Sequence, residues 1–307
     1  MSLGRYRNGQ ANGKDGMKMT RNADIHAEIA EAILAAMAEG AVPWHKPWKQ
    51  AIGSRPVNHA TGKVYRGANV WLLTAAQTRG RFETSRWVTR KQAATIGASV
   101  RDGSKPTRIH FYKIIEGRET DANGKRKTFP MLRSFSVFNT AQCDGVTLPE
   151  VVEPEPFEAS ARADTIIADM PNPPTICTNG GDRACYMPTL DSIHMPARES
   201  FESPAAYYGT LFHELAHSTG HASRLARETL LNTDGFGGTV YAREELTAEL
   251  AAAYLRADAH LDADVSQSAA YIADWSKIIT NDPGCFMSAA GAAQKATDYI
   301  LGVTWNA

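Results

Sequence analysis

Cysteine is scarce in this sequence, and none of the cysteines is paired as Cys-x-x-Cys. The 307-residue chain has four, at Cys143, Cys177, Cys185 and Cys285. So few cysteines argue against a disulfide-stabilised scaffold and against a zinc site built from paired thiolates. Long apolar runs are also missing from the sequence, so no membrane span and no membrane partner are expected.

Residues 1–16 lack the apolar stretch of a secretory signal and are instead polar and rich in Gly and Asn. They are expected to be a disordered leader or an appended segment, with Met17 as a candidate for the natural start. The chain is 43% hydrophobic and 21% charged, a composition typical of soluble globular proteins, and its length suits two domains. Together with the scarcity of cysteine, this predicts a cytoplasmic protein.

A formal net charge of zero conceals two halves of opposite sign. Residues 17–150 contain 21 Lys and Arg against 11 Asp and Glu, a net of +10, whereas residues 151–307 contain 9 against 21, a net of −12. Prolines and glutamates alternate where the sign changes, which favours an extended, solvated chain. We therefore place a basic domain at 17–148, a linker at 149–158 and an acidic domain at 159–307. The basic half suits a polyanionic partner.

The basic half is expected to be α+β. An apolar repeat over 25–37 predicts a helix that Asn22 caps and Gly40 closes. Short helices are expected at 70–77 and 89–96, followed by strands at 108–115 and 132–138. A turn at 121–124 lies between these strands, so they are predicted to form a hairpin.

The acidic half is expected to begin with a helix at 161–169 and two strands, 175–177 and 185–195, around a turn at 179–182. Three helices follow in the prediction. The first has Ser203 as N-cap, Pro204 at its first position and Gly220 beyond its end. The others cover about 242–255 and 269–279. A helix, a small antiparallel sheet and two or three helices are the layout of a zincin.

The first of these helices contains the segment His213-Glu214-Leu215-Ala216-His217. Residues four apart on a helix project from one face, so the imidazoles of His213 and His217 can bind one cation. Glu214 lies close to that face and is suited to accept a proton from the attacking water. His-Glu-x-x-His occurs by chance in other helices, but here the helix is capped at both ends and its other face is apolar.

A catalytic zinc needs a third protein ligand. The metzincin pattern requires a histidine six residues after His217, where Ser223 stands, so that subclass is excluded. His221 is one alternative, but it follows the helix end at Gly220 and is expected to point along the exit loop.

The favoured third ligand is Glu245, with Glu249 on the same helical face as the partner of a ligand histidine. The swap of these two roles is the main alternative, and Glu244 is expected to be solvated. Tyr241 and His260 are candidate donors for the oxyanion. The strand at 193–195 is expected to offer an edge to an extended substrate.

Aromatic residues alternate with cations in the basic half, a combination that holds single-stranded nucleic acid by stacking on bases and pairing with phosphates. Any one of these tryptophans could equally be a core residue. The candidate DNA-binding residues are Trp44, Lys46, Trp48, Lys49, Arg66, Arg86, Trp87, Arg90, Lys91 and Arg108.

Two resemblances follow from these motifs. The acidic half resembles gluzincin-like metallopeptidases, with His-Glu-x-x-His on one helix and a glutamate on the next. The chain from about residue 17 resembles the ArdC-type antirestriction proteins of conjugative plasmids, through segments 58–69, 87–93, 137–143, 213–217 and 241–250. The resemblance implies an N-terminal domain that binds single-stranded DNA, a C-terminal metallopeptidase domain and protection of entering plasmid DNA from host restriction.

Three functions are compatible with the sequence. The first is a metalloendopeptidase tethered to DNA, with a protein substrate such as a restriction-modification component. The second is a DNA-shielding protein whose metal site is not catalytic, and the third is a peptidase whose basic half docks acidic proteins. Glu214 favours an enzyme, since a structural metal site needs no general base. Zinc is the expected ion, with manganese or another divalent ion as alternatives.

Overall fold

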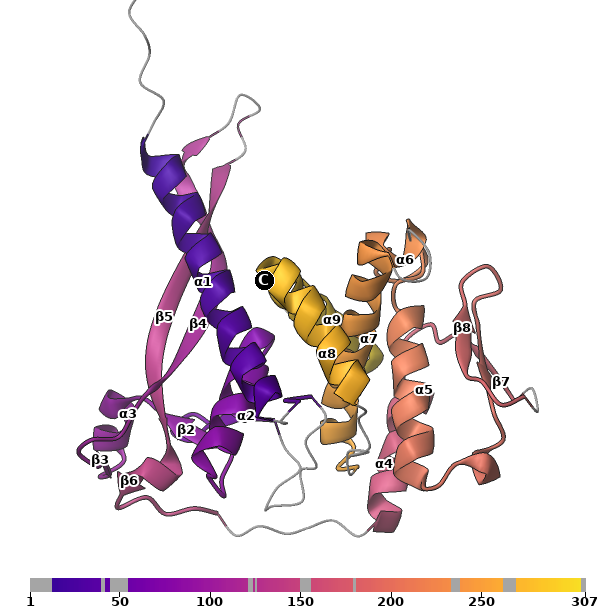
Figure 1. Ribbon diagram of the computed structural model, residues 1–307, viewed down its shortest axis with the longest axis horizontal. Coiled ribbons are helices and arrows are strands. Elements are labelled where there is room, and N and C mark those ends of the chain that lie inside the picture. The colour runs from indigo at the N-terminus through magenta and orange to yellow at the C-terminus, as the bar shows by residue number, and fades with distance from the viewer. Residues whose placement is uncertain are drawn as a thin grey trace, which may run out of the picture.

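The computed structural model describes residues 13–39, 42–44, 55–120, 124, 126–149, 156–178, 181–232, 238–261 and 269–304. Helices and strands are mixed along the chain, which confirms the expected α+β class (Figure 1). The predictions for residues 1–12, for most of the Pro and Glu linker and for Lys46, Trp48 and Lys49 lie outside the described residues.

The basic half is built on a long hairpin. β4 (Thr107–Thr120) pairs antiparallel with β5 (Arg126–Asn139), as predicted, and the sheet continues through β2 (Arg86–Val88) to β1 (Val57–Asn58) in the order β1-β2-β5-β4. A separate pair joins β3 (Ser99–Val100) to β6 (Cys143–Asp144). The helices of this half are α1 (Gly13–Ala38), α2 (Ala68–Gly80) and α3 (Arg90–Thr95).

The predicted first helix is present, but its start is wrong. α1 extends back to Gly13, so Asn22 lies inside the helix and does not cap it. The apolar repeat is confirmed, because Ile25, Ile29 and Ile33 are all buried. The short helix predicted at 89–96 is α3, and Thr89 caps it, its side chain accepting from Gln92 N.

The acidic half begins with α4 (Pro156–Ala168) and a three-stranded sheet, and then becomes helical. The helices are α5 (Pro204–Ser218), α6 (Glu228–Leu231), α7 (Thr239–Asp258), α8 (Ala269–Asn281) and α9 (Pro283–Ile300). Ser203 caps α5 as predicted, its hydroxyl accepting from Ala206 N at 3.1 Å. The last helix was missed, although Asp282 and Pro283 start it by the same rule.

The small sheet differs from the prediction. The expected strand at 185–195 is two strands, β8 (Cys185–Met187) and β9 (Ser192–Met195), because Pro188 and the turn after it break the run. β9 lies between β8, to which it is antiparallel, and β7 (Thr175–Thr178), to which it is parallel. The sheet is therefore mixed, and its edges are β7 and β8.

The two halves share one hydrophobic core. Figure 1 shows α1 beside α8 and α9, with the hairpin on one side and α5 on the other. Trp71 of α2 stacks on Tyr254 of α7 at 4.7 Å between ring centroids, and Trp44 lies 5.8 Å from Phe286 of α9. Further members of this core are Ile29, Ile33, Met37, Leu73, Leu246, Leu250, Ala289, Ala290 and Ala293.

Polar contacts also join the halves. Gly67, before α2, donates its N–H to Gln294 Oε1 at 3.1 Å, and its carbonyl accepts from the Tyr254 hydroxyl at 3.0 Å. Its φ of 56° is one that favours glycine. Arg55 pairs with Asp258 and lies over the Tyr254 ring. The orientation of α2 on α7 and α9 is thus fixed by side-chain and backbone groups together.

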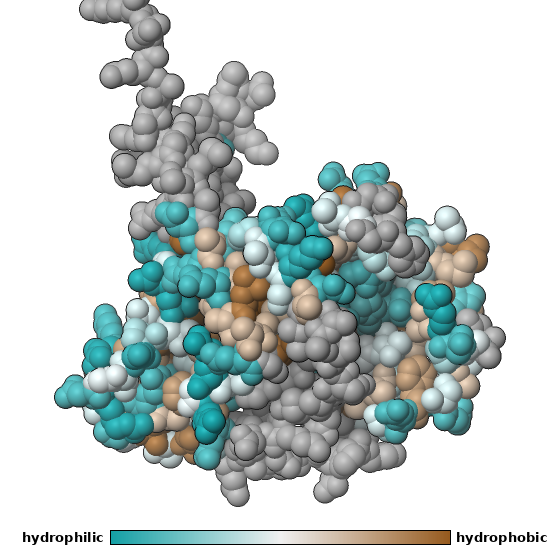
Figure 2. All heavy atoms as spheres, viewed as in Figure 1, coloured by the Kyte–Doolittle hydropathy of each residue, from teal (hydrophilic) through white to brown (hydrophobic). Residues whose placement is uncertain are grey.

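No helix in the described part of the chain has both the length and the apolar character of a membrane span. The face shown in Figure 2 is mostly hydrophilic on its left side, with a group of hydrophobic residues near the middle and a mixture of both kinds on the right.

Candidate functional site

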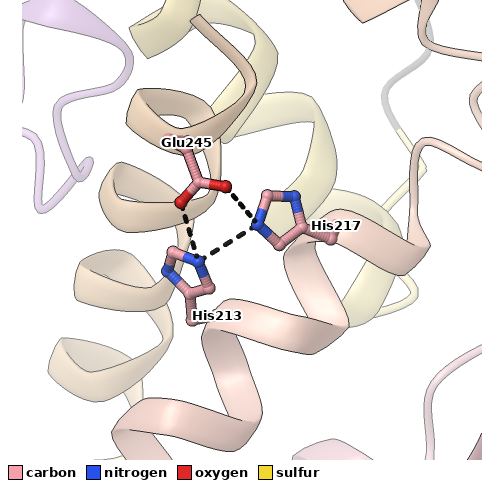
Figure 3. A group of neighbouring side chains, drawn as sticks. All are labelled: His213, His217 and Glu245. Atoms are coloured by element: carbon pink, nitrogen blue, oxygen red, sulfur yellow. Dashed lines mark hydrogen bonds and ion pairs between the residues drawn. The ribbon is translucent and has the colours of Figure 1, made fainter. Parts of the chain in front are cut away.

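α5 carries both histidines on the face turned toward α7. The opposite face of α5 is anchored by Tyr208, Leu211 and Leu215, which are buried against the small sheet and α4. This packing leaves His213 and His217 side by side, with Glu245 of α7 facing them (Figure 3). The helix spacing and the buried face together determine which groups meet.

The three side chains have the geometry of a metal site. The Nε2 atoms of His213 and His217 are 3.1 Å apart, and each lies 3.5 Å from a carboxylate oxygen of Glu245. A tetrahedral ion with bonds of about 2.0–2.1 Å separates its ligand atoms by about 3.3–3.4 Å. Among the described residues these three form the group able to hold a metal ion. A divalent ion therefore fits between them with little movement.

His221 is not part of this group. Its Nδ1 lies 2.8 Å from the Ser223 hydroxyl and accepts from the Ser223 N–H at 3.2 Å. The imidazole is held within the loop after α5, as expected from the sequence, and it is not among the described residues that could share a metal ion.

The prediction that Glu244 is solvated is wrong. The residue is 3% exposed, and its Oε1 is 3.1 Å from Nδ1 of His217. Arg227 donates to both carboxylate oxygens, and Thr229 donates to one. Although burial opposes the charge, the hydrogen bonds from Arg227 and His217 lower the pKa of Glu244 to about 2. Glu244 therefore stays ionised and directs Nε2 of His217 toward the metal position.

Glu249 lies near the other histidine. Its Oε1 is 3.8 Å from Nδ1 of His213, on the side away from Glu245. Burial lowers the pKa of His213, but the hydrogen bond to Glu245 and the charges of Glu249 and Glu214 outweigh it and raise the pKa to about 9. The surrounding carboxylates thus favour positive charge at this point, whether a proton or a cation supplies it.

Glu214 is held by the edge strand of the small sheet. Its Oε2 accepts from the backbone N–H of Tyr186 in β8 at 2.7 Å, and the side chain is 8% exposed. Tyr186 is fixed in turn, because its hydroxyl donates to Asp191 and Arg224 pairs with the same carboxylate. The contact shows that β8, not β9, is the edge beside the site, which corrects the predicted role of 193–195.

The two candidate oxyanion donors have different positions. Tyr241 hydrogen-bonds Glu245 and lies close enough to Glu214 for its charge to be felt; burial and these carboxylates raise the pKa of its hydroxyl, which keeps it protonated. His260 follows the far end of α7, about 22 Å along the helix axis from Glu245. The structure thus removes His260 from the site and leaves Tyr241 in it.

Two of the predicted DNA-stacking residues are core residues. Trp44 is 1% exposed and packs on Phe286, and Trp87 is 0% exposed and meets Phe82 edge to face. A buried ring has no face for a base, so these two predictions are wrong for this conformation. The sequence pattern could not separate them from surface aromatics, because core tryptophans near surface cations produce the same alternation.

The described cations vary in their availability. Arg90 and Lys91 are exposed at the start of α3, with the Arg90 guanidinium 5.1 Å from the Phe138 ring. Arg108 is exposed and pairs with Glu28 at 3.4 Å. Arg66 pairs with Asp298 at the junction of the halves, and Arg86 is half-buried. Their contact with DNA stays a prediction.

Known families match both parts of the chain. Residues 23–138 match the N-terminal domain of the anti-restriction factor ArdC, and residues 161–292 match the zincin-like metallopeptidase family. The second match contains Glu214 and the three residues that meet between α5 and α7, His213, His217 and Glu245.

Similar proteins occur in two bacteria. Two proteins of Escherichia coli described as DNA primase TraC are 36% and 37% identical over 294 and 295 residues. These matches cover 90% of this chain but 20% and 27% of the relatives, so the chain spans a small part of their length. Protein y4eC of Sinorhizobium fredii is 32% identical, with 90% of this chain and 91% of that protein covered.

Two solved structures have the same fold over nearly their whole length. They are the metal-free and Mn(II)-bound antirestriction ArdC protein from the R388 plasmid, 33% and 32% identical to this chain, with TM-scores of 0.72 and 0.71. Each comparison covers 90% of this chain, and they cover 96% and 97% of the solved chains. With both of its parts matched by family models as well, this chain belongs to the ArdC family of antirestriction proteins, with a zincin-like domain in its second half.

Proposed function

We propose that this protein holds single-stranded DNA with its basic half, hydrolyses peptide bonds at the site between α5 and α7, and so protects entering plasmid DNA from host restriction. The observation that carries the peptidase proposal is the approach of two Nε2 atoms to 3.1 Å, each 3.5 Å from one of the two oxygens of Glu245, beside the oriented carboxylate of Glu214. A metal site used only for structure has no need of that carboxylate.

His213, His217 and Glu245 would hold one divalent ion, for which we propose zinc, with manganese as the alternative. The Mn(II)-bound ArdC structure from R388 supports a divalent ion in the family. When bound, such an ion polarises the peptide carbonyl and lowers the pKa of water to about 7.

The surrounding residues perform the proton transfers. Glu214 accepts a proton from the attacking water and delivers it to the departing amine, as a carboxylate fixed by Tyr186 N–H is placed to do. The protonated Tyr241 hydroxyl donates to the carbonyl oxygen as negative charge develops there. β8 is the edge strand beside Glu214, and an extended peptide that adds to it as a further strand would take the Tyr186 N–H that Glu214 accepts from in this structure.

In Figure 1 the β4–β5 hairpin lies on one side of α1, α8 and α9, and α5 and α7, which carry the metal site, lie on the other. DNA bound to the hairpin side is therefore a tether and not the substrate of Glu214. The substrate we propose is a protein that meets the same DNA strand, a restriction-modification component in particular.

The test incubates the full chain, loaded with zinc or manganese, with a restriction enzyme and single-stranded DNA. The wild type is expected to cleave the enzyme, whereas Glu214→Gln keeps its metal and fold but loses cleavage, because the amide cannot accept a proton. Glu202→Gln, an exposed carboxylate before α5, is the matched control. If the wild type and Glu214→Gln protect DNA equally and neither cleaves the restriction enzyme, the result favours the DNA-shielding function instead.

A further inference from the structure

A pocket of about 880 Å³ lies in the basic half, apart from the metal site, and one of the predicted DNA-binding cations, Lys91, lines it. Its floor is one face of the β4–β5 hairpin, where Ile109, Phe111, Phe135 and Val137 point the same way. The opposite face carries His110, whose backbone is held by Asn69 of α2. The hairpin is thus anchored to α2 through His110, and the face that carries Ile109 and Phe111 lines the pocket.

Two exposed phenyl rings cover the floor of the pocket. Phe111 is 48% exposed and Phe135 is 42% exposed, and their rings meet edge to face with centroids 5.4 Å apart. Ile109 and Val137, on the same face of the hairpin, are buried in the shared core. Aromatic rings exposed on a paired hairpin can serve as a platform on which a planar ligand stacks.

One wall of the pocket presents amide groups. Asn58 and Gln92 exchange two hydrogen bonds of 3.3 Å, so each amide supplies both a donor and an acceptor. Asn58 also donates to the buried Tyr65 hydroxyl, and Gln92 Oε1 accepts from Thr89 N. The edge of a nucleobase also carries donors and acceptors side by side. It can therefore take the place of one amide in the hydrogen bonds between Asn58 and Gln92.

The rim of the pocket is basic. Lys91 of α3 and Arg133 of β5 are exposed lining residues, and Arg133 stands opposite Phe111 in the strand register. Cations at the rim and rings at the floor separate the charged part of a ligand from its planar part. A nucleotide of an unpaired strand has this division, with phosphate outside and base inside, whereas a phosphoserine or phosphothreonine side chain carries no planar group for the floor.

We propose that this pocket binds an unpaired nucleobase of single-stranded DNA, with Phe111 and Phe135 as the stacking platform and Lys91 and Arg133 as the phosphate contacts. The proposal rests on the single-strand binding proposed above and assigns it a place in the structure. Paired bases are stacked on their neighbours and cannot enter, so duplex DNA is excluded from the pocket.

The test compares two labelled oligonucleotides of equal length and charge, one with thymine bases and one abasic, by fluorescence anisotropy with the full-length protein. Phe111→Ala and Phe135→Ala are expected to weaken binding of the thymine strand by about 5- to 100-fold and to leave the abasic strand unaffected. Phe135→Trp keeps an aromatic face at this position, so it should bind the thymine strand about as well as the wild type does. Leu231→Ala removes an apolar side chain of similar exposure from the other half and is the matched control. Both rings are exposed, so these variants are expected to fold.

Lys91→Gln and Arg133→Gln are expected to weaken both strands alike and to reduce the dependence on salt. The pocket proposal is overturned if the phenylalanine variants bind the thymine strand like the wild type, or lose the same factor on the abasic strand. Those results leave wild-type binding intact, so they are distinguishable from failure of the proposed function, in which the wild type binds neither strand.

Discussion

At the scale of single residues, the metal site depends on carboxylates behind the ligands as much as on the ligands. Glu244 contacts Nδ1 of His217, and Glu249 approaches Nδ1 of His213. Each contact leaves an Nε2 lone pair for a cation and restricts rotation of the ring. Glu244 is the more firmly held of the two, because Arg227 binds both of its oxygens and also the carbonyl of Ala216 in α5.

Substitutions in α7 should rank these roles. Glu245→Ala is expected to give the largest loss of metal affinity, because it removes a ligand. Glu244→Ala and Glu249→Ala should each cost about 10–100-fold, since they release a histidine from its orienting contact. Metal content after dialysis, measured by mass spectrometry, checks the order, with Glu202→Ala as an exposed control. Full metal retention by Glu244→Ala would show that the His217 contact has no orienting role.

Metal binding should depend on pH through His213. Its pKa of about 9 means that a proton occupies the metal-free site near pH 7 and must leave when an ion binds. Apparent affinity should therefore rise toward pH 9, by up to about tenfold per pH unit. Conversely, the raised pKa stabilises the metal-free protein fully below about pH 6.5, and this stabilisation is lost as pH rises through 9.

Calorimetric titrations with the same metal in two buffers of different ionisation enthalpy measure the protons released. Glu249→Gln removes one of the charges that raise the pKa, so the rise in affinity should move to lower pH in that variant. Binding without proton release near pH 7 would contradict the assignment.

At the scale of elements, the sequence predicted best where a local rule decides the structure. Ser203 and Pro204 set the start of α5, and the spacing of His213 and His217 sets their common face. The small sheet was not predictable in this way, because strand order depends on which edges pack against α5. The mistake over Glu244 has the same origin. Sequence spacing shows on which side of α7 Glu244 lies. It does not show that Arg227, from the loop before α6, covers that side and buries the carboxylate.

Gly220, in the loop between α5 and α6, lies against residues that support the metal site. A Cβ at Gly220 would lie 2.9 Å from Cδ2 of Leu230 and 3.0 Å from Nη2 of Arg227. Gly220→Ala is therefore expected to displace Arg227, to destabilise the protein by about 1–3 kcal/mol and to weaken metal binding through Glu244.

Gly291 in α9 is the matched control, because a Cβ there meets no atom within 4 Å among the described residues. Gly291→Ala should stabilise the helix by up to about 1 kcal/mol and leave metal binding unchanged. Denaturant unfolding and metal titration of both variants provide the measurement. A neutral Gly220→Ala variant would mean that the loop shifts without cost to the site.

At the scale of the whole molecule, the opposite charges of the two halves suggested parts that separate at the linker. The family matches at 23–138 and 161–292 agree with two sequence units, but the packing shows that the units are not independent bodies. Trp71 and Trp44 lie against α7 and α9. Composition could not reveal this, since a core tryptophan and a DNA-stacking tryptophan are the same letter in the sequence.

This shared core predicts that metal binding stabilises both halves. Unfolding of α7 and α9 would expose the packed faces of α1 and α2, so the basic half should not survive alone when the acidic half unfolds. An ion at 100 times its dissociation constant adds about 2.7 kcal/mol to the stability of the state that binds it. Hydrogen exchange in α1 and α2, far from the metal position, should therefore slow on metal addition to the wild type.

The Glu245→Ala variant supplies the control, because it retains the shared core but loses a ligand. Its exchange in α1 and α2 should not respond to the metal, whereas the wild type should lose both halves in one unfolding transition that moves to higher temperature. Two transitions, of which only the one in the acidic half responds to the ion, would contradict a common core. That result would instead support halves that fold separately on either side of the Pro and Glu segment.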